Sequence, residues 1–558
     1  MIKRVLPVVG FVFACFFLFF FVADLIPLWS SDEGRYAEIA REMFESRNFI
    51  VPHFNYVEYL EKPILAPYAA SLFVGLLGEA DLVLRLPSIL SALLGILVTY
   101  IFTRRLFSDT TARLASLLLL TSIGYVLVGR FAVIDMQMIL LLSTSILFLM
   151  SGYFDQRRAN YLWAYFFMGL TVLTKGLIGV VLPGLIFFVF LVWTGRLEEI
   201  KRVSLGWGIV ILLFVVAPWV VAVSWVEPEF LDVFILKHHF ERFASGGFGR
   251  SRPFWFFSYV AVVVTFPWAL LVPSAVLQGL KGEEIERDKT KYLVSWITVI
   301  FIFFSIPRGK LPYYIVPICV PVAILVAGLL AAWKADRLHE NERKWLHYAM
   351  GFIGVVCVLG FFGLNIAVYA VREPEMVMLK TTIFTGSLAV AAGGVLCLWA
   401  LRKKRKDMTI LSLSGMIYTV LLVIFTGMVK LSPLESTYAF ASEIAPQLTP
   451  ETVVAVFASP DRFSDLPFYL KRRIVTVGGD RGTLDQGSID EDHQGESSEW
   501  FLPAHVFGAM FNRKEKQVYC LLEKERLQVM RQRTGVDTYH IVKDEYGKIL
   551  ISNRPSSA

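Results

Sequence analysis

Long apolar segments recur along this chain up to about residue 430, and they constrain its fold more than any other feature. Segments of about 20 apolar residues match the hydrocarbon thickness of a bilayer, where a helix satisfies its own backbone hydrogen bonds. Of the 558 residues, 56% are hydrophobic and 18% are charged, against about 45–50% and about 25% in soluble domains. The sequence therefore predicts a polytopic α-helical membrane protein.

The loops between the apolar segments predict how the helices cross the membrane. Arg and Lys gather in alternate loops on the same side as Lys3 and Arg4, and the positive-inside rule assigns that side to the cytoplasm. The first segment is too long for the apolar part of a signal peptide, so we expect it to be retained. Residues 64–78 are apolar but short, and we expect a helix in the outer interface there. We place 13 transmembrane helices, at 6–29, 84–104, 114–130, 133–153, 161–175, 177–195, 206–226, 254–275, 292–306, 313–333, 346–371, 380–401 and 409–430.

This topology divides the chain into two predicted domains. A membrane domain, 1–430, carries outer loops at 30–83 and 227–253. The segment 431–558 has ordinary soluble polarity and is expected to form a small α/β domain on the outer side. Its predicted strands lie at 452–458, 473–479, 517–522, 538–544 and 548–553, and its predicted helices at 465–472 and 523–533.

The stretch WSSDEGRYAEIAREMF follows directly on the first apolar segment. Ser30 and Glu33 fit a capping box, and the apolar residues that follow have helical spacing, so an amphipathic helix on the outer membrane surface is expected. That interpretation assigns Glu33 to the helix cap. It leaves Asp32 and Arg35 unexplained, because uncompensated charge at a membrane edge is costly. These two residues are functional candidates.

Other ionisable residues fall near the predicted outer ends of helices, where they are functional candidates for the same reason. Asp135 follows Arg130 closely, and an ion pair between the two is the structural alternative. Lys175 lies between two apolar segments with no partner nearby in sequence. The stretch YLEKP could be a solvated Glu–Lys pair before a helix; LKHHFERF precedes a glycine-rich loop that could hold an anion or a metal. These stretches and the PRGKLPYY turn add Tyr59, Glu61, Lys62, His239, Arg242, Arg308, Lys310 and Tyr313 to the candidates.

These clusters share one predicted side of the membrane, and that shared side narrows the class of function. Lys and Arg near the outer interface suit a lipid-phosphate substrate, whose charge must be held and neutralised. A transporter or flippase would instead place ionisable residues near the bilayer midplane, in broken helices or repeats. A non-catalytic scaffold would not explain the charged clusters. The net charge of +7 implies no nucleic acid partner, because its location matters more than its sum.

The stretch SSDEGRYAEIAREMFESRNFIVPHFNYVEYLEKP, at 30–63, resembles the first outer loop of lipid-linked-sugar glycosyltransferases of the protein O-mannosyltransferase superfamily. It is most similar to bacterial lipid A aminoarabinose transferases, which share D-E-x-R-Y-A-E, V-P-H-F and E-K-P. The resemblance implies a GT-C fold and inverting transfer from an undecaprenyl-phosphate-linked sugar. It also implies a multi-pass protein of the bacterial inner membrane, in contact with membrane lipids, whose active site and C-terminal domain face the periplasm.

The resemblance also assigns roles to the candidates. It makes Asp32 and Asp135 catalytic, and Glu61 with His239 a pair of ligands for a divalent cation, zinc or magnesium. Two ligands are too few for a closed zinc site, so such an ion would be weakly held or completed by substrate. The substrate-binding residues would be Arg35, Tyr59, Lys62, Lys175, Arg242, Arg308, Lys310 and Tyr313.

The acceptor and the sugar stay open at this point. A lipid A phosphate is already nucleophilic, so Asp32 would orient Arg35 or stabilise positive charge on the sugar. A hydroxyl acceptor, as in protein O-mannosylation or on another envelope glycan, would instead need Asp32 as a general base. V-P-H-F and E-K-P favour lipid A. The sequence does not identify the sugar, because no acidic residue can be assigned to a 4-amino group.

Overall fold

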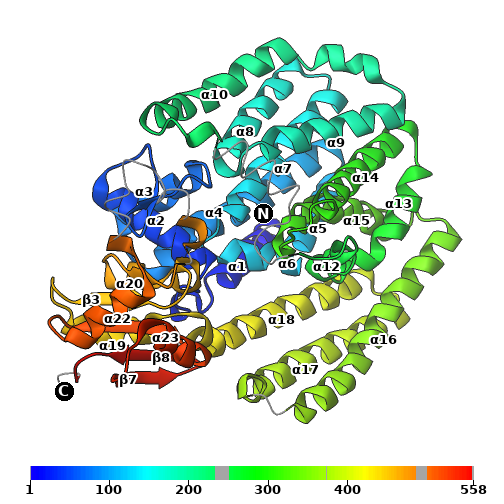
Figure 1. The fold of residues 1–558 in the computed structure, drawn as a ribbon. Coiled ribbons are helices and arrows are strands. Elements are labelled where there is room, and N and C mark those ends of the chain that lie inside the picture. Colours follow the sequence, from blue (N-terminus) through cyan, green and yellow to red (C-terminus); the bar gives the residue numbers. More distant parts are fainter. Residues whose placement is uncertain (1, 233–250, 372–373, 480, 485–498, 556–558) are drawn as a thin grey trace. The chain divides into compact units, whose positions relative to one another are not determined.

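The computed structural model describes residues 2–232, 251–371, 374–479, 481–484 and 499–555, and it is predominantly helical (Figure 1). It contains two compact units, which we describe separately. The helical unit comprises Met1–Ala23, Ser88–Val220 and Ile235–Met428. The mixed unit comprises Asp24–Pro87, Val221–Phe234 and Val429–Ala558, so it includes both the first loop and the C-terminal segment. The first loop, which we assigned to the membrane domain, thus groups with the C-terminal segment.

Each of the 13 predicted spans coincides with a helix or with two consecutive helices. α4, α10 and α18 continue from the helical unit into the mixed unit. The helices are α1 (Ile2–Phe20), α4 (Asp81–Leu106), α5 (Asp109–Leu120), α6 (Ile123–Arg130), α7 (Ile134–Phe154), α8 (Arg158–Lys175), α9 (Ile178–Thr194), α10 (Leu205–Val226), α12 (Phe256–Val264), α13 (Val272–Leu280), α14 (Glu284–Ser305), α15 (Cys319–Lys334), α16 (Glu340–Ala370), α17 (Pro374–Arg402) and α18 (Lys406–Glu435).

Length and composition allow fewer spans than helices. Among the described residues, eight helices are long and apolar enough to cross a membrane, or up to ten if each of two bent pairs is one span. The bends are 62° between α5 and α6 and 102° at the break after α12. α9 has only 17 residues, and α14 begins with charged sequence. The chain is a multi-pass membrane protein, and the number 13 stays a prediction.

Packing within the helical unit separates interior helices from peripheral ones. In the most apolar windows of α7 and of the α15 span, 83% and 89% of residues are buried, against 11% in α10. α16 and α17 lie side by side (Figure 1). Hydropathy does not distinguish these classes, because a face that contacts lipid is as apolar as one that contacts protein.

The C-terminal part of the mixed unit forms the predicted α/β domain. A six-stranded sheet has the order β5-β4-β3-β6-β8-β7, with β3 parallel to β4 and β6, β4 parallel to β5, and β8 antiparallel to β6 and β7. The two-residue strand β5 and the helices α19 and α22 were not predicted. The elements are α19 (Tyr438–Ile444), β3 (Val453–Val456), α20 (Leu466–Leu470), β4 (Val475–Val477), β5 (Phe501–Leu502), α22 (Ala504–Arg513), β6 (Val518–Glu523), α23 (Leu527–Thr534), β7 (His540–Glu545) and β8 (Lys548–Ser552).

Alternation along the central strands buries both faces of this sheet. Val454 and Val456 of β3 belong to a cluster with residues of α19 and α20. Ala455, between them, belongs to a second cluster with residues of α22 and α23. Successive strand side chains point to opposite faces, so a continuous apolar strand indicates a sheet covered on both sides.

The first loop is joined to this domain by a β-hairpin. It contains α2 (Asp32–Ser46), β1 (His53–Phe54), β2 (Val57–Glu58) and α3 (Leu65–Leu77), the predicted short helix. Asn55 and Tyr56, between the strands, have φ of 56° and 63°, as a two-residue type I′ turn requires. The Asn55 carboxamide donates to the carbonyl of Ile474 and accepts from its N–H, both at 2.8 Å. The hairpin is thereby fixed to the residue before β4.

Candidate active site

The start of α2 differs from the predicted capping box. The helix begins at Asp32, and the preceding Ser31 makes no side-chain cap hydrogen bond. Ser30 Oγ instead donates to Asp465 Oδ1 at 2.5 Å. Glu33 Oε2 accepts from the N–H of Trp29 at 3.1 Å. The capping box is wrong because Ser30 has a carboxylate partner 435 residues away, which no local motif can reveal.

Glu33 has a second partner that the sequence did not predict. Glu33 is only 2% exposed. Arg85 Nε and Nη2 donate to its two carboxylate oxygens, each at 2.9 Å. Arg85 also donates to the carbonyls of Ile26 and Pro27. Glu33 therefore belongs to a buried, doubly hydrogen-bonded ion pair that joins the starts of α2 and α4.

The amphipathic helix predicted after the first apolar segment is present as α2, and Glu38, Arg41 and Glu42 on its polar face are buried against protein, which was not predicted. Its location on the outer membrane surface stays a prediction. Arg41 donates to both carboxylate oxygens of Glu38 at 2.7 Å. The Glu42 carboxylate accepts from the N–H of Tyr56 at 3.0 and 3.1 Å. Burial, together with the nearby Glu38, raises the pKa of Glu42. Because the hairpin covers this face, its charges pair with protein groups instead of water.

Asp32 and Arg35, the candidates from the same stretch, form an ion pair. Arg35 also forms one that was not predicted: its Nη1 donates to Asp461 Oδ1 of the C-terminal domain at 2.9 Å. Burial opposes the charge of Arg35, but neighbouring groups, including both carboxylates, hold its pKa well above the ordinary value. Arg35 is therefore a buried cation shared between two carboxylates.

Aromatic rings enclose the same guanidinium. Its carbon lies 5.5 Å from the ring centre of Tyr36 and 6.0 Å from that of Tyr59. Tyr59 is buried, and its hydroxyl donates to Glu61 Oε2 at 3.5 Å. Lys62, three residues after Tyr59, is partly exposed. We call Asp32, Arg35, Tyr59 and Asp461 the Arg35 cluster.

In the helical unit the structure brings three other predicted site residues together. Lys175, at the end of α8, forms an ion pair with Asp135, at the start of α7. Its Nζ lies 5.7 Å from the ring centre of Tyr313 and 4.7 Å from that of Tyr314. Arg130, the alternative partner considered for Asp135, donates to two backbone carbonyls of the first helical segment, at 2.7 and 2.9 Å.

The PRGKLPYY turn gives its two cations different environments. Lys310 is buried and donates to the carbonyls of Arg252 and Pro307. Arg308 is exposed, and its carbonyl accepts from the N–H of Arg252 at 2.9 Å. Lys310 thus stabilises the turn against the 251–253 segment, whereas Arg308 is accessible. Arg242 and His239 lie outside the described residues.

The described residues do not provide a complete metal site. No group of three or more His, Cys, Asp or Glu side chains that could hold an ion occurs in the described part of the chain. Glu61 is described, whereas its predicted co-ligand His239 is not. A divalent ion held by these two residues stays a prediction.

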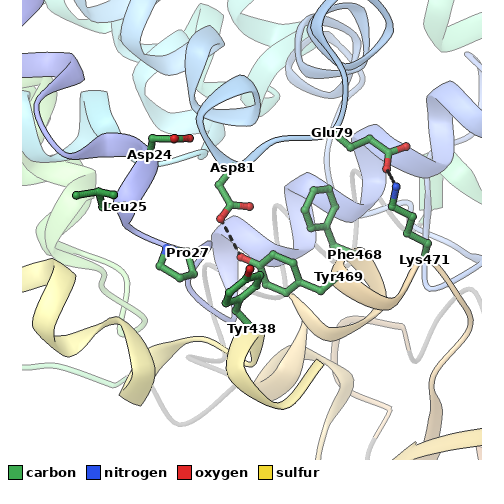
Figure 2. A pocket seen from close by; sticks show the side chains of 9 residues that line it. All are labelled: Asp24, Leu25, Pro27, Glu79, Asp81, Tyr438, Phe468, Tyr469 and Lys471. Carbon is green, nitrogen blue, oxygen red and sulfur yellow. Dashed lines mark hydrogen bonds and ion pairs between the residues drawn. The ribbon is translucent and has the colours of Figure 1, made fainter. Parts of the chain in front are cut away.

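A polar cavity of ≈330 Å³ lies elsewhere in the mixed unit (Figure 2). Asp81 accepts from the hydroxyl of Tyr469 at 3.2 Å, and Glu79 forms an ion pair with Lys471 at 2.7 Å. None of the predicted site residues lines this cavity. Its lining is Asp24, Leu25, Pro27, Glu79, Asp81, Tyr438, Phe468, Tyr469 and Lys471.

Sequence reasoning missed Asp461 and Asp465 of the C-terminal domain. Asp465 accepts from Ser30, from the Ser436 hydroxyl at 2.8 Å and from the N–H of Thr437 at 2.6 Å. Asp465 begins the predicted helix at 465–472, and Asp461 lies four residues before it, so no helical spacing relates the two aspartates. Their partners on α2 could not be predicted from that spacing.

Comparisons with known proteins identify the family. Residues 61–222 match the family model of dolichyl-phosphate-mannose-protein mannosyltransferases. An undecaprenyl phosphate-alpha-4-amino-4-deoxy-L-arabinose arabinosyl transferase from Aeromonas hydrophila subsp. hydrophila is 31% identical over 388 residues, covering 66% of this chain and 69% of that protein. The enzyme of the same name from Shewanella sediminis is 31% identical over 496 residues, covering 84% and 86%.

Comparisons with solved structures indicate the same family and fold. The crystal structure of ArnT from Cupriavidus metallidurans bound to undecaprenyl phosphate has a TM-score of 0.83 and 25% identity, and covers 98% of both chains. The Archaeoglobus fulgidus oligosaccharyltransferase, at 13% identity and a TM-score of 0.54 over 96% of this chain and 71% of that one, shares the fold alone. The predicted resemblance and GT-C fold are confirmed. The chain is a glycosyltransferase and belongs to the family of undecaprenyl phosphate-alpha-4-amino-4-deoxy-L-arabinose arabinosyl transferases.

Proposed function

We propose that the protein transfers 4-amino-4-deoxy-L-arabinose from undecaprenyl phosphate to a phosphate of lipid A. The reaction takes place on the periplasmic side of the bacterial inner membrane. The names of the relatives support the sugar and its carrier. The positive-inside rule, which puts the predicted site residues on the outer side, supports the location.

The Arg35 cluster is the observation that carries this proposal. One guanidinium is shared by two carboxylates, so these three side chains have a net charge of −1. The side chain of Asp32 is 28% exposed, which leaves part of its carboxylate accessible to a substrate. An accessible carboxylate in a partly buried site stabilises a nearby positive charge more strongly than it would in water.

The reaction needs such stabilisation. The bond between the anomeric carbon and the carrier phosphate breaks, and its electron pair leaves with undecaprenyl phosphate. A lipid A phosphate oxygen forms the new bond from the opposite face, which inverts the configuration. Positive charge builds on the sugar as the first bond lengthens, and Asp32 stabilises it. In this role Asp32 acts through its negative charge and transfers no proton, because the acceptor phosphate is already an anion.

The remaining site residues supply cations for the two phosphates. In the helical unit Lys175 and Arg308 are cations that can neutralise a phosphate, and Asp135 orients Lys175 through their ion pair. Tyr313 and Tyr314 restrict the position of the same ammonium group. A divalent ion on Glu61 and His239 would add positive charge at the phosphates.

A second acceptor class is favoured by the match of residues 61–222 to the mannosyltransferase family model. In that alternative a protein hydroxyl accepts mannose from a polyprenyl carrier. The hydroxyl loses a proton, so Asp32 would have to act as a general base.

Transfer by the purified full chain in lipid nanodiscs tests the proposal. Synthetic undecaprenyl-phosphate aminoarabinose is offered with lipid A, and polyprenyl-phosphate mannose with a Ser/Thr-rich peptide, each with and without EDTA. Aminoarabinose on lipid A phosphate, detected by mass spectrometry, supports the proposal. Mannosylated peptide with unmodified lipid A supports the alternative, and no product from folded protein contradicts both. Loss of product in EDTA that added Zn²⁺ or Mg²⁺ restores would support the metal.

A further inference from the structure

We propose that Asp461, from the C-terminal α/β domain, is a positioning residue of the transfer site that acts on Asp32 through Arg35. This inference rests on the proposed function. It assigns the C-terminal domain a part in setting the charge of the site, in addition to packing against the first loop.

The guanidinium of Arg35 is the link between the two carboxylates. Its Nη1 donates to Asp461 at 2.9 Å and its Nη2 donates to Asp32. Arg35 is 7% exposed, and its Nε has no hydrogen-bond partner among the described residues. A buried arginine held at both Nη atoms has little freedom to rotate, so Asp461 fixes the direction from which Arg35 approaches Asp32.

Asp461 is itself held in place. Thr483 donates from its hydroxyl to Asp461 Oδ1 at 2.7 Å and from its N–H to Oδ2 at 3.0 Å. The preceding Gly482 has φ of +56°, and a Cβ there would lie 2.5 Å from Asp461 Oδ2. Only glycine fits this turn without strain, and the turn directs both Thr483 donors at the carboxylate. A chain of hydrogen bonds therefore runs from Thr483 through Asp461 and Arg35 to Asp32.

The number of carboxylates that pair with Arg35 sets the net charge of the cluster that faces the sugar. With Asp461 present, Arg35 is shared and the three side chains carry −1. Without that charge, Arg35 would neutralise Asp32, and less negative charge would face the developing positive charge on the sugar. Loss of Asp461 should therefore slow the chemical step. It should not weaken binding of the anionic donor, because removing a negative charge does not repel a phosphate.

Asp465, four residues on, shows what a purely structural carboxylate looks like in this region. It is fully buried and binds Ser30, Ser436 and the N–H of Thr437. The side chain of Asp461 is 26% exposed, and its contact with α2 is to a predicted site residue. The two aspartates can therefore be separated by experiment.

The test measures transfer by the full chain in nanodiscs, under single-turnover conditions that resolve slow variants, for wild type, D461N, D461E, R35K and D461N/R35K. D544N is the matched control, because Asp544 forms an ion pair with Lys524 in the same domain at 2.7 Å. We expect D461N to lower the rate of the chemical step about 10- to 100-fold, with donor KM changed by less than about twofold and the melting temperature unchanged. D461E should recover most of the loss, and D544N should match wild type.

The double variant separates a positioning role from a structural one. If Asp461 acts through Arg35, D461N should slow R35K by less than about threefold, because interacting residues are not additive. Additive losses, an unchanged rate in D461N, or a raised donor KM would overturn the proposal. If D461N does not fold, D461S decides, since it also removes the charge and leaves Arg35 with Asp32 alone: a slower step at normal stability supports the proposal, and a normal rate overturns it. An inactive wild type would contradict the proposed function instead.

Discussion

Arg85 donates two hydrogen bonds to Glu33, the residue next to Asp32, and both side chains are buried. The first turn of α2 is therefore held by one ion pair that faces the start of α4, while Asp32 and Arg35 are left for the Arg35 cluster. Neighbouring acidic residues in one motif thus have different partners.

Replacement of Glu33 by glutamine should lower the free energy of unfolding by about 3–5 kcal/mol, because it removes one charge of a buried, doubly hydrogen-bonded ion pair. Thermal unfolding in detergent, with chemical denaturation as a second measure, checks this. The double variant E33Q/R85Q should recover most of the loss. Equal stability of E33Q and wild type would show that the pair contributes nothing.

Replacement of Asp32 by asparagine should reduce transfer about 100- to 1,000-fold, because it removes the charge that faces the sugar. The protein should still fold and insert, since the Asp32 side chain is partly exposed. Product formation and the melting temperature are measured together, with D407N as a control at an exposed ion pair with Lys334. Near-normal turnover of D32N would remove Asp32 from the active site.

The ion pair of Asp135 and Lys175 allows a test of function against structure. K175M should reduce both transfer and stability, because it removes the ammonium group that forms an ion pair with the buried Asp135 carboxylate. D135N/K175M removes both charges and should restore the melting temperature but not transfer. Recovery of both would reduce the pair to a structural contact.

Asp465 should make stability depend on pH. Burial raises its pKa, although Ser30, Thr437 and Ser436 donate hydrogen bonds that oppose the shift. A carboxyl whose pKa is raised by folding contributes stability below its unfolded pKa, about 3.9, and loses that contribution as pH rises through the folded value. Wild type should therefore lose stability relative to D465N as pH rises from the unfolded pKa through the folded pKa of Asp465.

Melting temperatures of the two proteins between pH 4 and pH 7.5, recorded in one detergent, give this difference directly. Their curves should converge at the acid end, where both side chains are neutral. If the melting temperature of wild type instead rises relative to that of D465N as pH increases, the folded protein favours the charged form of Asp465.

The helices of this protein could be predicted from the sequence because their cause is local. Apolar length and charged loops located the 13 segments, and the strands of the C-terminal domain followed from short apolar runs between turns. The pattern from Asp32 to Lys62 was sufficient to recognise the family. Asp135 and Lys175 were singled out because charge is costly near a membrane, and they proved to be partners.

The tertiary structure decided which charges meet. Ser30 fitted a cap in sequence, yet it binds Asp465; Glu33 binds Arg85, 52 residues away; and Arg35 binds Asp461, 426 residues away. A capping motif reports only the neighbours that a residue would have in an isolated helix. Burial makes an unpaired charge so costly that distant partners prevail over local ones, and only the folded chain brings those partners within hydrogen-bond distance.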